Sequence, residues 1–179
     1  DAYLGFLADA VPRPDGRGRV CDVGCGSGAF GEAWVRAFGP GAEVTLLEPS
    51  AQMLNRAAQA LSARGVTPVL AQTDLAGFTP PVGGFDHLLV AHVIEHFDDP
   101  AEALSLMRTW VEPGQRLWLV ASKPHWCNAI IWLQWRHRTF ERDEIAALLA
   151  KTGWRLDATH AFPSGPPSRT SRGYLATAV

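Results

Sequence analysis

The sequence predicts an α/β fold, a doubly wound, mainly parallel seven-stranded sheet with an antiparallel C-terminal hairpin. Three features indicate it. Short apolar segments alternate with segments of helical periodicity up to the fifth predicted strand. A glycine-rich turn joins the first predicted strand, 19–23, to the helix after it. The last two predicted strands, 155–161 and 173–179, are joined by a Pro- and Ser-rich segment without a predicted helix, which favours an antiparallel pair.

Length and composition restrict the possible classes of protein. A chain of 179 residues with 47% hydrophobic residues is predicted to form one domain, over 1–179, with one core. The formal net charge of −2, without a run of like charges, gives no sign of a nucleic-acid partner. The longest uncharged apolar stretch, 126–135, is too short to span a membrane. No signal peptide is visible and the three cysteines lack disulfide-type spacing, so we expect a cytoplasmic protein. We expect it to be a monomer or a homodimer.

The other predicted strands and helices follow from apolar runs and from end signals. Strands are predicted at 43–48, 66–71, 85–91 and 116–121. Helices are predicted at 1–11, 30–38, 51–64, 100–111 and 140–151. Ser50 and Asp99 are predicted N-caps, Pro100 suits a first helical position, and Gly65 and Gly153 lie beyond helix ends.

The glycine turn after the first strand fits two classes of ligand. Gly24-x-Gly26-x-x-Ala29 fits the dinucleotide fingerprint in its Gly/Ala form. Asp22-x-Gly24-x-Gly26-x-Gly28 also fits the pattern used for S-adenosylmethionine. The carboxylate of Asp22 distinguishes the two, because it would repel a pyrophosphate and attract an ammonium group.

Acidic residues follow three consecutive strands of the predicted sheet. In open α/β sheets, ligands bind beyond the C-terminal ends of the strands. Asp22 ends the first strand, Glu48 ends the second at 20 positions after Gly28, and Asp74 follows the third. Each acid alone is equally well read as a solvated loop residue. Together they would surround a cationic ligand that carries a ribose and an adenine.

At these residues the chain resembles class I S-adenosylmethionine-dependent methyltransferases, in the broad group that includes ubiquinone-biosynthesis O-methyltransferases. The most specific parts of the resemblance are at 20–28, 47–54 and 85–100. It implies a Rossmann-like fold, S-adenosyl-L-methionine as the cofactor, and transferase activity. The implied reaction is methylation of a small apolar or aromatic molecule, with oxygen or carbon as the favoured acceptor.

The resemblance also implies roles for individual residues in cofactor binding. The implied cofactor-binding residues are Asp22, Gly24, Gly26, Glu48, Met53, Asp74, Leu75 and Ala91. In the family pattern, Asp22 and the glycine backbone hold the methionine moiety, and the Ala91 carbonyl meets its ammonium group. Glu48 holds the ribose, while Asp74 and the Leu75 backbone meet the adenine. Met53 would pack near the cofactor, although a methionine on a helical face is equally expected in the core.

Two histidines after the fourth strand are the candidate bases, His92 and His96. His96 is the first choice, by resemblance to the family's Glu-His pair. The alternative is that either histidine only shapes the pocket or binds backbone. The run His92-x-x-Glu95-His96 also matches a zinc pattern, but that pattern requires a helix and here it follows directly on a strand, so no metal is predicted.

The segment 125–138 is rich in tryptophan and is predicted to lie over the mouth of the pocket. His125, Trp126 and His137 are its predicted substrate contacts, and packing against the sheet or a dimer partner is the alternative. Arg169 and Arg172, next to the last strand, could meet an anionic substrate group or be solvated.

Two other functions remain open. A nicotinamide-dependent oxidoreductase could use the same glycine turn, and Asp22 argues against it. The second alternative is a protein that binds S-adenosylmethionine without catalysing a reaction, and the presence of His92 and His96 argues against this alternative.

Overall fold

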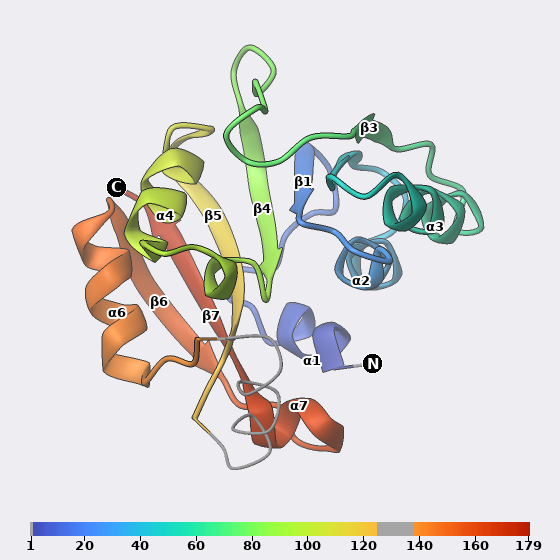
Figure 1. The fold of residues 1–179 in the computed structure, drawn as a ribbon. Coiled ribbons are helices and arrows are strands. Elements are labelled where there is room, and N and C mark those ends of the chain that lie inside the picture. Colours follow the sequence, from blue (N-terminus) through green and yellow to red (C-terminus); the bar gives the residue numbers. More distant parts are fainter. Residues whose placement is uncertain (1, 125–137) are drawn as a thin grey trace.

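The computed structural model describes residues 2–124 and 138–179, which form a seven-stranded sheet with helices on both faces (Figure 1). The strands are β1 Arg19–Val23, β2 Glu43–Leu47, β3 Val69–Ala71, β4 Phe85–Ala91, β5 Val111–Ser122, β6 Trp154–His160 and β7 Ser171–Ala178. The helices of these residues are α1 Ala2–Ala8, α2 Ala29–Phe38, α3 Ala51–Ser62, the short 3₁₀ helix η1 Ile94–His96, α4 Pro100–Arg108, α6 Arg142–Lys151 and α7 Gly165–Thr170.

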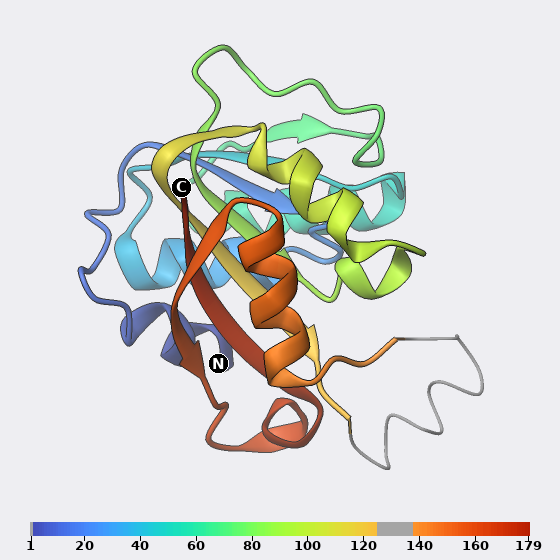
Figure 2. The same ribbon diagram turned by 90° about the vertical axis from the view of Figure 1, so that its left-hand side faces the viewer.

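The strand order is β3-β2-β1-β4-β5-β7-β6. Strands β1 to β5 are parallel, and β7 runs antiparallel to both β5 and β6 (Figure 2). The predicted doubly wound, mainly parallel sheet with an antiparallel C-terminal pair is therefore confirmed. The chain proceeds outward from β1 to β3 and then crosses to β4, so β1 and β4 flank the switch point where ligands bind in such sheets.

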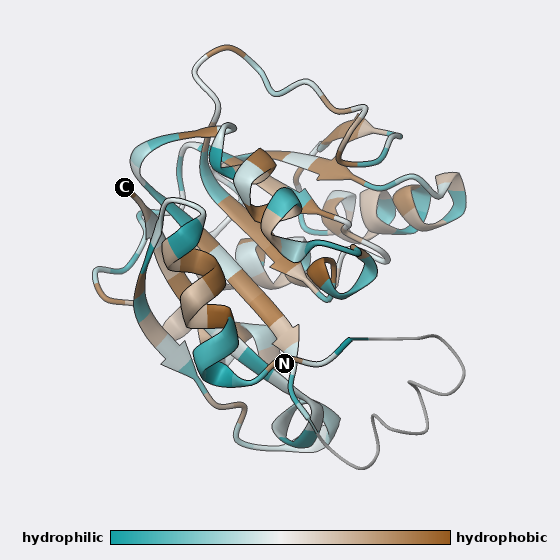
Figure 3. Cartoon of the chain, turned by 60° about the vertical axis from the view of Figure 1, so that its left-hand side comes forward, coloured by the Kyte–Doolittle hydropathy of each residue, from teal (hydrophilic) through white to brown (hydrophobic). Residues whose placement is uncertain are grey.

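Each face of the sheet buries its own apolar cluster. One cluster packs the sheet against α1, α2 and α3 and contains Trp34 and Trp118. The other packs it against α4 and α6 and contains Trp110 and Trp154. Figure 3 shows the apolar strands beneath helices such as α6, whose hydrophilic residues lie mainly at its two ends. No helix within residues 2–124 and 138–179 has both the length and the apolarity of a membrane span.

Strand β5 is longer than predicted, and the helix before it is shorter. That helix was predicted to reach residue 111, but α4 ends at Arg108 and Val111 already belongs to β5. The Thr109 hydroxyl donates to the Leu106 carbonyl at 2.7 Å and closes the last helical turn. Val111 then pairs with Phe85 of β4, and this long-range pairing outweighs the local helical pattern.

Other differences from the predicted elements are smaller. β3 covers only 69–71 of the predicted 66–71, and α6 begins at Arg142 instead of residue 140. The connection between β6 and β7 contains α7, which the sequence did not predict. Proline in the first turn suits a helix start, and the Ser168 hydroxyl donates to the Gly165 carbonyl at 2.7 Å.

Candidate cofactor and active site

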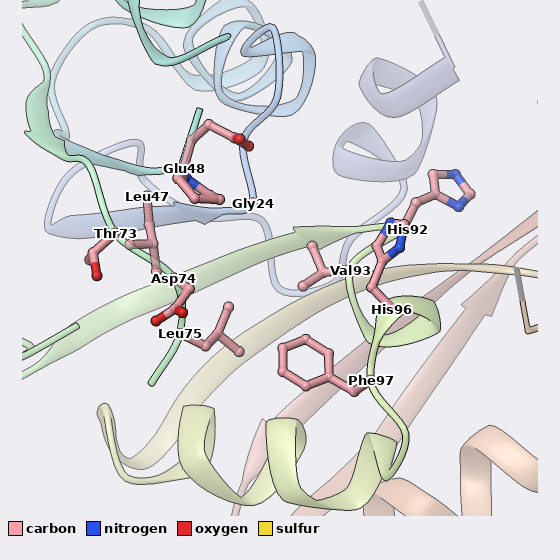
Figure 4. A pocket seen from close by; sticks show the side chains of 11 residues that line it. Gly24, Leu47, Glu48, Thr73, Asp74, Leu75, His92, Val93, His96 and Phe97 are labelled. Atoms are coloured by element: carbon pink, nitrogen blue, oxygen red, sulfur yellow. The ribbon is translucent and has the colours of Figure 1, made fainter. Parts of the chain in front are cut away.

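A pocket of about 320 Å³ lies beyond the C-terminal ends of β1, β2 and β4. Figure 4 shows Glu48 and Asp74 toward one end of it and His92 and His96 toward the other. The described lining residues are Gly24, Leu47, Glu48, Pro49, Thr73, Asp74, Leu75, His92, Val93, His96 and Phe97. The structure thus brings together four of the predicted cofactor-binding residues and both predicted histidines.

The glycine turn lets β1, α3 and the residues after β4 approach closely. Gly28 has φ +85°, and a Cβ atom there would lie 2.7 Å from the Cα atom of Ala57 in α3. A Cβ atom on Gly24, which has φ +59°, would lie 2.7 Å from a Val93 methyl group. Both positions therefore require glycine, for backbone conformation and for space.

Asp22 lies beneath the glycine turn, and it is not among the residues that line the pocket. Its side chain is buried, and its Oδ2 atom accepts a hydrogen bond of 2.8 Å from the Gly31 backbone in α2. Burial raises the pKa of Asp22 to about 7, the Gly31 hydrogen bond opposes this, and the charge of Glu48 adds to it. The carboxylate therefore fixes the start of α2, and a direct contact with the cofactor stays a prediction.

Glu48 is oriented by two backbone donors. Its Oε2 atom accepts from Gly26 N at 3.1 Å, and its Oε1 atom accepts from Ser50 N at 3.0 Å. Each carboxylate oxygen can accept a second hydrogen bond, so the group can still bind two hydroxyls in the pocket. Asp74 is held in the same way, because its Oδ1 atom accepts from Gly77 N at 2.8 Å.

His92 has an unusual backbone and a complete set of side-chain contacts. Its φ is +57°, the only positive value for a non-glycine residue in the described part of the chain. Its Nδ1 atom lies 3.1 Å from Oε1 of Glu95 and 3.1 Å from Oγ of Ser122. Its Nε2 atom lies 3.3 Å from Oγ of Ser171. A strained backbone held by this many contacts is typical of a functional site.

Glu95 is the buried partner of His92. Its side chain has no exposed surface, and its Oε1 atom also accepts from Ser122 N at 2.7 Å. Burial raises the pKa of Glu95, but the contacts with His92 and Ser122 lower it by more, so that the net pKa is lowered. A charged carboxylate beside Nδ1 favours the tautomer that carries its proton there.

The remaining predicted site residues lie elsewhere. Met53 lies on α3 and is 38% exposed, so it is not part of the core. Ala91 is the last residue of β4. Neither is among the residues that line the pocket. His125, Trp126 and His137 lie outside the described residues. In the described part of the chain, no group of three or more His, Cys, Asp or Glu residues is arranged to hold a metal ion.

Sequence reasoning missed several residues of the site. Thr73, Val93 and Phe97 line the pocket. Each is next in the sequence to a residue that was predicted to belong to the site, and this adjacency could have indicated them. Ser122 and Ser171 contact His92 from 30 and 79 positions away, and no local pattern in the sequence indicates such contacts.

Residues 1–159 match the family model described as "Methyltransferase domain". A ubiquinone biosynthesis O-methyltransferase from Methylocella silvestris is 29% identical over 104 residues, which are 58% of this chain and 40% of the relative. The chain spans between 24% and 51% of the length of curated relatives that it matches.

Solved structures share the fold. The mitomycin 7-O-methyltransferase MmcR superposes with a TM-score of 0.80 at 25% identity, over 99% of this chain and 53% of that one. Magnesium protoporphyrin IX methyltransferase from Synechocystis PCC 6803, solved with bound SAM, superposes with a TM-score of 0.73 at 23% identity, over 100% and 77% of the two chains. The match over 1–159, together with the sheet and the pocket at its switch point, shows that this chain belongs to the class I S-adenosylmethionine-dependent methyltransferase family.

Proposed function

We propose that this protein transfers a methyl group from S-adenosylmethionine to an oxygen or carbon atom of a small apolar or aromatic molecule. We further propose that residues 1–179 form one cofactor-binding domain. The observation that carries the proposal is one pocket with two carboxylates, Glu48 and Asp74, toward one end and two histidines toward the other. A cationic nucleoside fits the acidic end, and a proton acceptor fits the other.

The acidic end suits the nucleoside. Glu48, fixed by Gly26 and Ser50, would accept hydrogen bonds from both ribose hydroxyls. The Oδ1 atom of Asp74 accepts from Gly77, which leaves Oδ2 for the adenine amino group, and Leu75 would lie against the ring. The described lining contains no lysine or arginine that would repel a sulfonium ion.

The methionine moiety would extend along the glycine turn toward the histidines. The Gly24 and Gly26 backbone would meet its carboxylate, and the Ala91 carbonyl would meet its ammonium group. Asp22, buried under the turn, would add negative charge near that ammonium group. Met53 would contact the cofactor only at the outer edge of the site, given its exposure on α3.

The cofactor, when bound, supplies an electrophilic methyl group for in-line displacement. The residues of the chain would align the acceptor with that methyl group and take up the acceptor's proton. His92 is the favoured base, because Glu95 orients its Nδ1 atom. Its Nε2 atom, which contacts the Ser171 hydroxyl at 3.3 Å, would exchange that contact for the proton of the acceptor. His96, which also lines the pocket, is the second candidate. His125, Trp126 and His137 remain the proposed substrate contacts.

Two measurements test this function. Calorimetric titration with S-adenosylhomocysteine and with NAD should give binding of the first and none of the second. Incubation with S-adenosylmethionine and a panel of phenols and quinols should release S-adenosylhomocysteine with at least one acceptor. Binding of NAD in place of S-adenosylhomocysteine would instead support the oxidoreductase alternative and contradict the proposal.

A further inference from the structure

A second cavity, of about 440 Å³, lies at the end of the β5–β7 pair, outside the cofactor pocket. Its described lining includes the cationic residues Lys123, Arg169 and Arg172 and a single carboxylate, Glu141. The positive charge is therefore local, because the chain as a whole has a formal net charge of −2. A concave surface lined mainly by one sign of charge attracts ligands of the opposite sign.

Backbone hydrogen bonds hold these residues together. Lys123 N donates to the Thr170 carbonyl at 2.9 Å, and Lys123 Nζ donates to the Ser168 carbonyl at 2.7 Å, which joins the end of β5 to α7. On the opposite side, Phe140 N donates to the Ser122 carbonyl at 2.8 Å and brings the residues before α6 against β5. The cavity thus has walls from three segments that the sheet brings together.

The charges also converge on a buried tyrosine in β7, Tyr174. Burial raises the pKa of Tyr174, while the positive charges of Arg172 and Arg142 lower it and the negative charge of Glu141 raises it. Arg172 and Glu141, which line the cavity, therefore both lie close enough to Tyr174 to act on its hydroxyl.

The cavity lies next to the proposed base. Ser122 and Ser171 are paired across β5 and β7, and their hydroxyls contact the two ring nitrogens of His92. Lys123 and Arg172 are the next residues along the chain, and consecutive Cα atoms are about 3.8 Å apart. Successive strand residues point to opposite faces, so Ser171 contacts His92 on one face of the sheet and Arg172 lines the cavity on the other. An acceptor that passes over the C-terminal end of β5, with its reacting atom at His92, could place a charged group in the cavity.

The two hollows carry opposite charge. Glu48 and Asp74 line the cofactor pocket, whose described lining has no lysine or arginine. The second cavity has three cationic side chains and one carboxylate among its described lining residues. A sulfonium cofactor is therefore drawn to the first hollow and repelled from the second, and an anion has the opposite preference.

We propose that this cavity binds one anionic group, a carboxylate or a phosphate, of the methyl acceptor. Guanidinium groups such as those of Arg169 and Arg172 bind both kinds of oxyanion with paired hydrogen bonds, and the ammonium group of Lys123 adds a third cationic contact. The role in methyl transfer rests on the proposed function, whereas anion binding itself can be measured without it.

The test compares three probes by calorimetry, with and without saturating S-adenosylhomocysteine: para-hydroxybenzoate, phenyl phosphate, and the neutral methyl ester of para-hydroxybenzoate. At least one anion should bind about tenfold more tightly than the ester, as expected of charge-assisted hydrogen bonds. The better of the two anions identifies the oxyanion. Arg172→Gln and Arg169→Gln should each reduce the preference. Arg169 is exposed, so its replacement should leave the fold intact.

The control variant is Arg155→Gln, because Arg155 lies in β6 and its ion pair with Asp157 is remote from the cavity lining. It should keep the full preference for the anion. Equal binding of anion and ester, no binding of either anion, or a preference that survives in the Arg169→Gln/Arg172→Gln double variant would overturn the proposal. A preference for anions in a protein that does not bind S-adenosylhomocysteine would support the cavity and contradict the proposed function.

Discussion

The Nδ1 atom of His92 lies 3.1 Å from the Oε1 atom of Glu95, whose side chain is wholly buried. Glu95 follows His92 by three positions, and the positive φ of His92 turns the chain from β4 into η1. The pair therefore forms within one short segment at the switch point of the sheet. It places a carboxylate behind a histidine that lines the cofactor pocket, as a general base requires.

The first prediction concerns which histidine is the base. His92→Asn should lower kcat by about 10²- to 10⁴-fold, the usual contribution of general acid–base catalysis, with little change in affinity for S-adenosylhomocysteine. His96→Asn is the matched comparison and should have the smaller effect, because the buried carboxylate of Glu95 orients the ring of His92 at 3.1 Å. Steady-state kinetics with an oxygen acceptor measures both variants. A larger loss in His96→Asn would assign the base to His96.

The second prediction concerns Glu95 as a positioning residue. Glu95→Gln keeps the size of the side chain and removes its charge, so we expect kcat to fall about 10- to 100-fold, with KM changing much less. Glu95→Asp, which restores the charge, should recover part of the activity. A purely structural role would instead lower thermal stability equally in both variants without this difference in kcat. The readouts are the kcat and KM of each variant together with its melting temperature.

The third prediction follows from the buried carboxyl of Asp22. Burial raises its pKa from 3.8 to about 7, so the folded protein retains a proton that the unfolded chain releases between these values. This group therefore stabilises the fold at low pH and loses that contribution as pH rises to about 7. At about 1.36 kcal/mol per pKa unit, the contribution of this carboxyl to the free energy of unfolding falls by about 4 kcal/mol over this pH range.

The substitution Asp22→Asn tests this, because the amide oxygen can still accept from Gly31. Urea unfolding of both proteins without cofactor, at about pH 4 and about pH 8, gives the difference in free energy of unfolding. From the lower to the higher pH, the free energy of unfolding of the variant should rise by about 4 kcal/mol relative to that of the wild type. A difference that does not change with pH would show that the buried carboxyl does not titrate in this range.

The fourth prediction concerns the close approach of the glycine turn to α3. Gly28→Ala should destabilise the fold, because its Cβ atom would lie 2.7 Å from the Ala57 Cα atom. Gly65→Ala is the matched control, since Gly65 also has a positive φ, +80°, but no atom within 4 Å of the added Cβ. The free energy of unfolding should fall by about 1–3 kcal/mol more for Gly28→Ala than for Gly65→Ala. Equal losses would mean that backbone conformation alone selects glycine at this turn.

Much of the fold and the acidic end of the site could be predicted because their signals are local. The glycine turn, the strand of 85–91 and the acids that follow β2 and β3 are all visible within short windows of sequence. Residues set by long-range pairing could not be predicted. Val111 joins β5 through Phe85, and Ser171 reaches His92 only because β7 inserts between β5 and β6. Their positions depend on tertiary contacts that no local pattern records.

The central claim, that the acidic end of the pocket binds the nucleoside, is tested most directly by calorimetric titration with S-adenosylhomocysteine. Glu48→Gln should weaken binding at least about tenfold, because it replaces a charged acceptor of two hydroxyls with a neutral amide. Glu43→Gln is the control, since Glu43 is exposed at the opposite end of the same strand, β2, and should bind as the wild type does. Wild-type binding that Glu48→Gln leaves unchanged, or no binding by the wild type, would contradict the account.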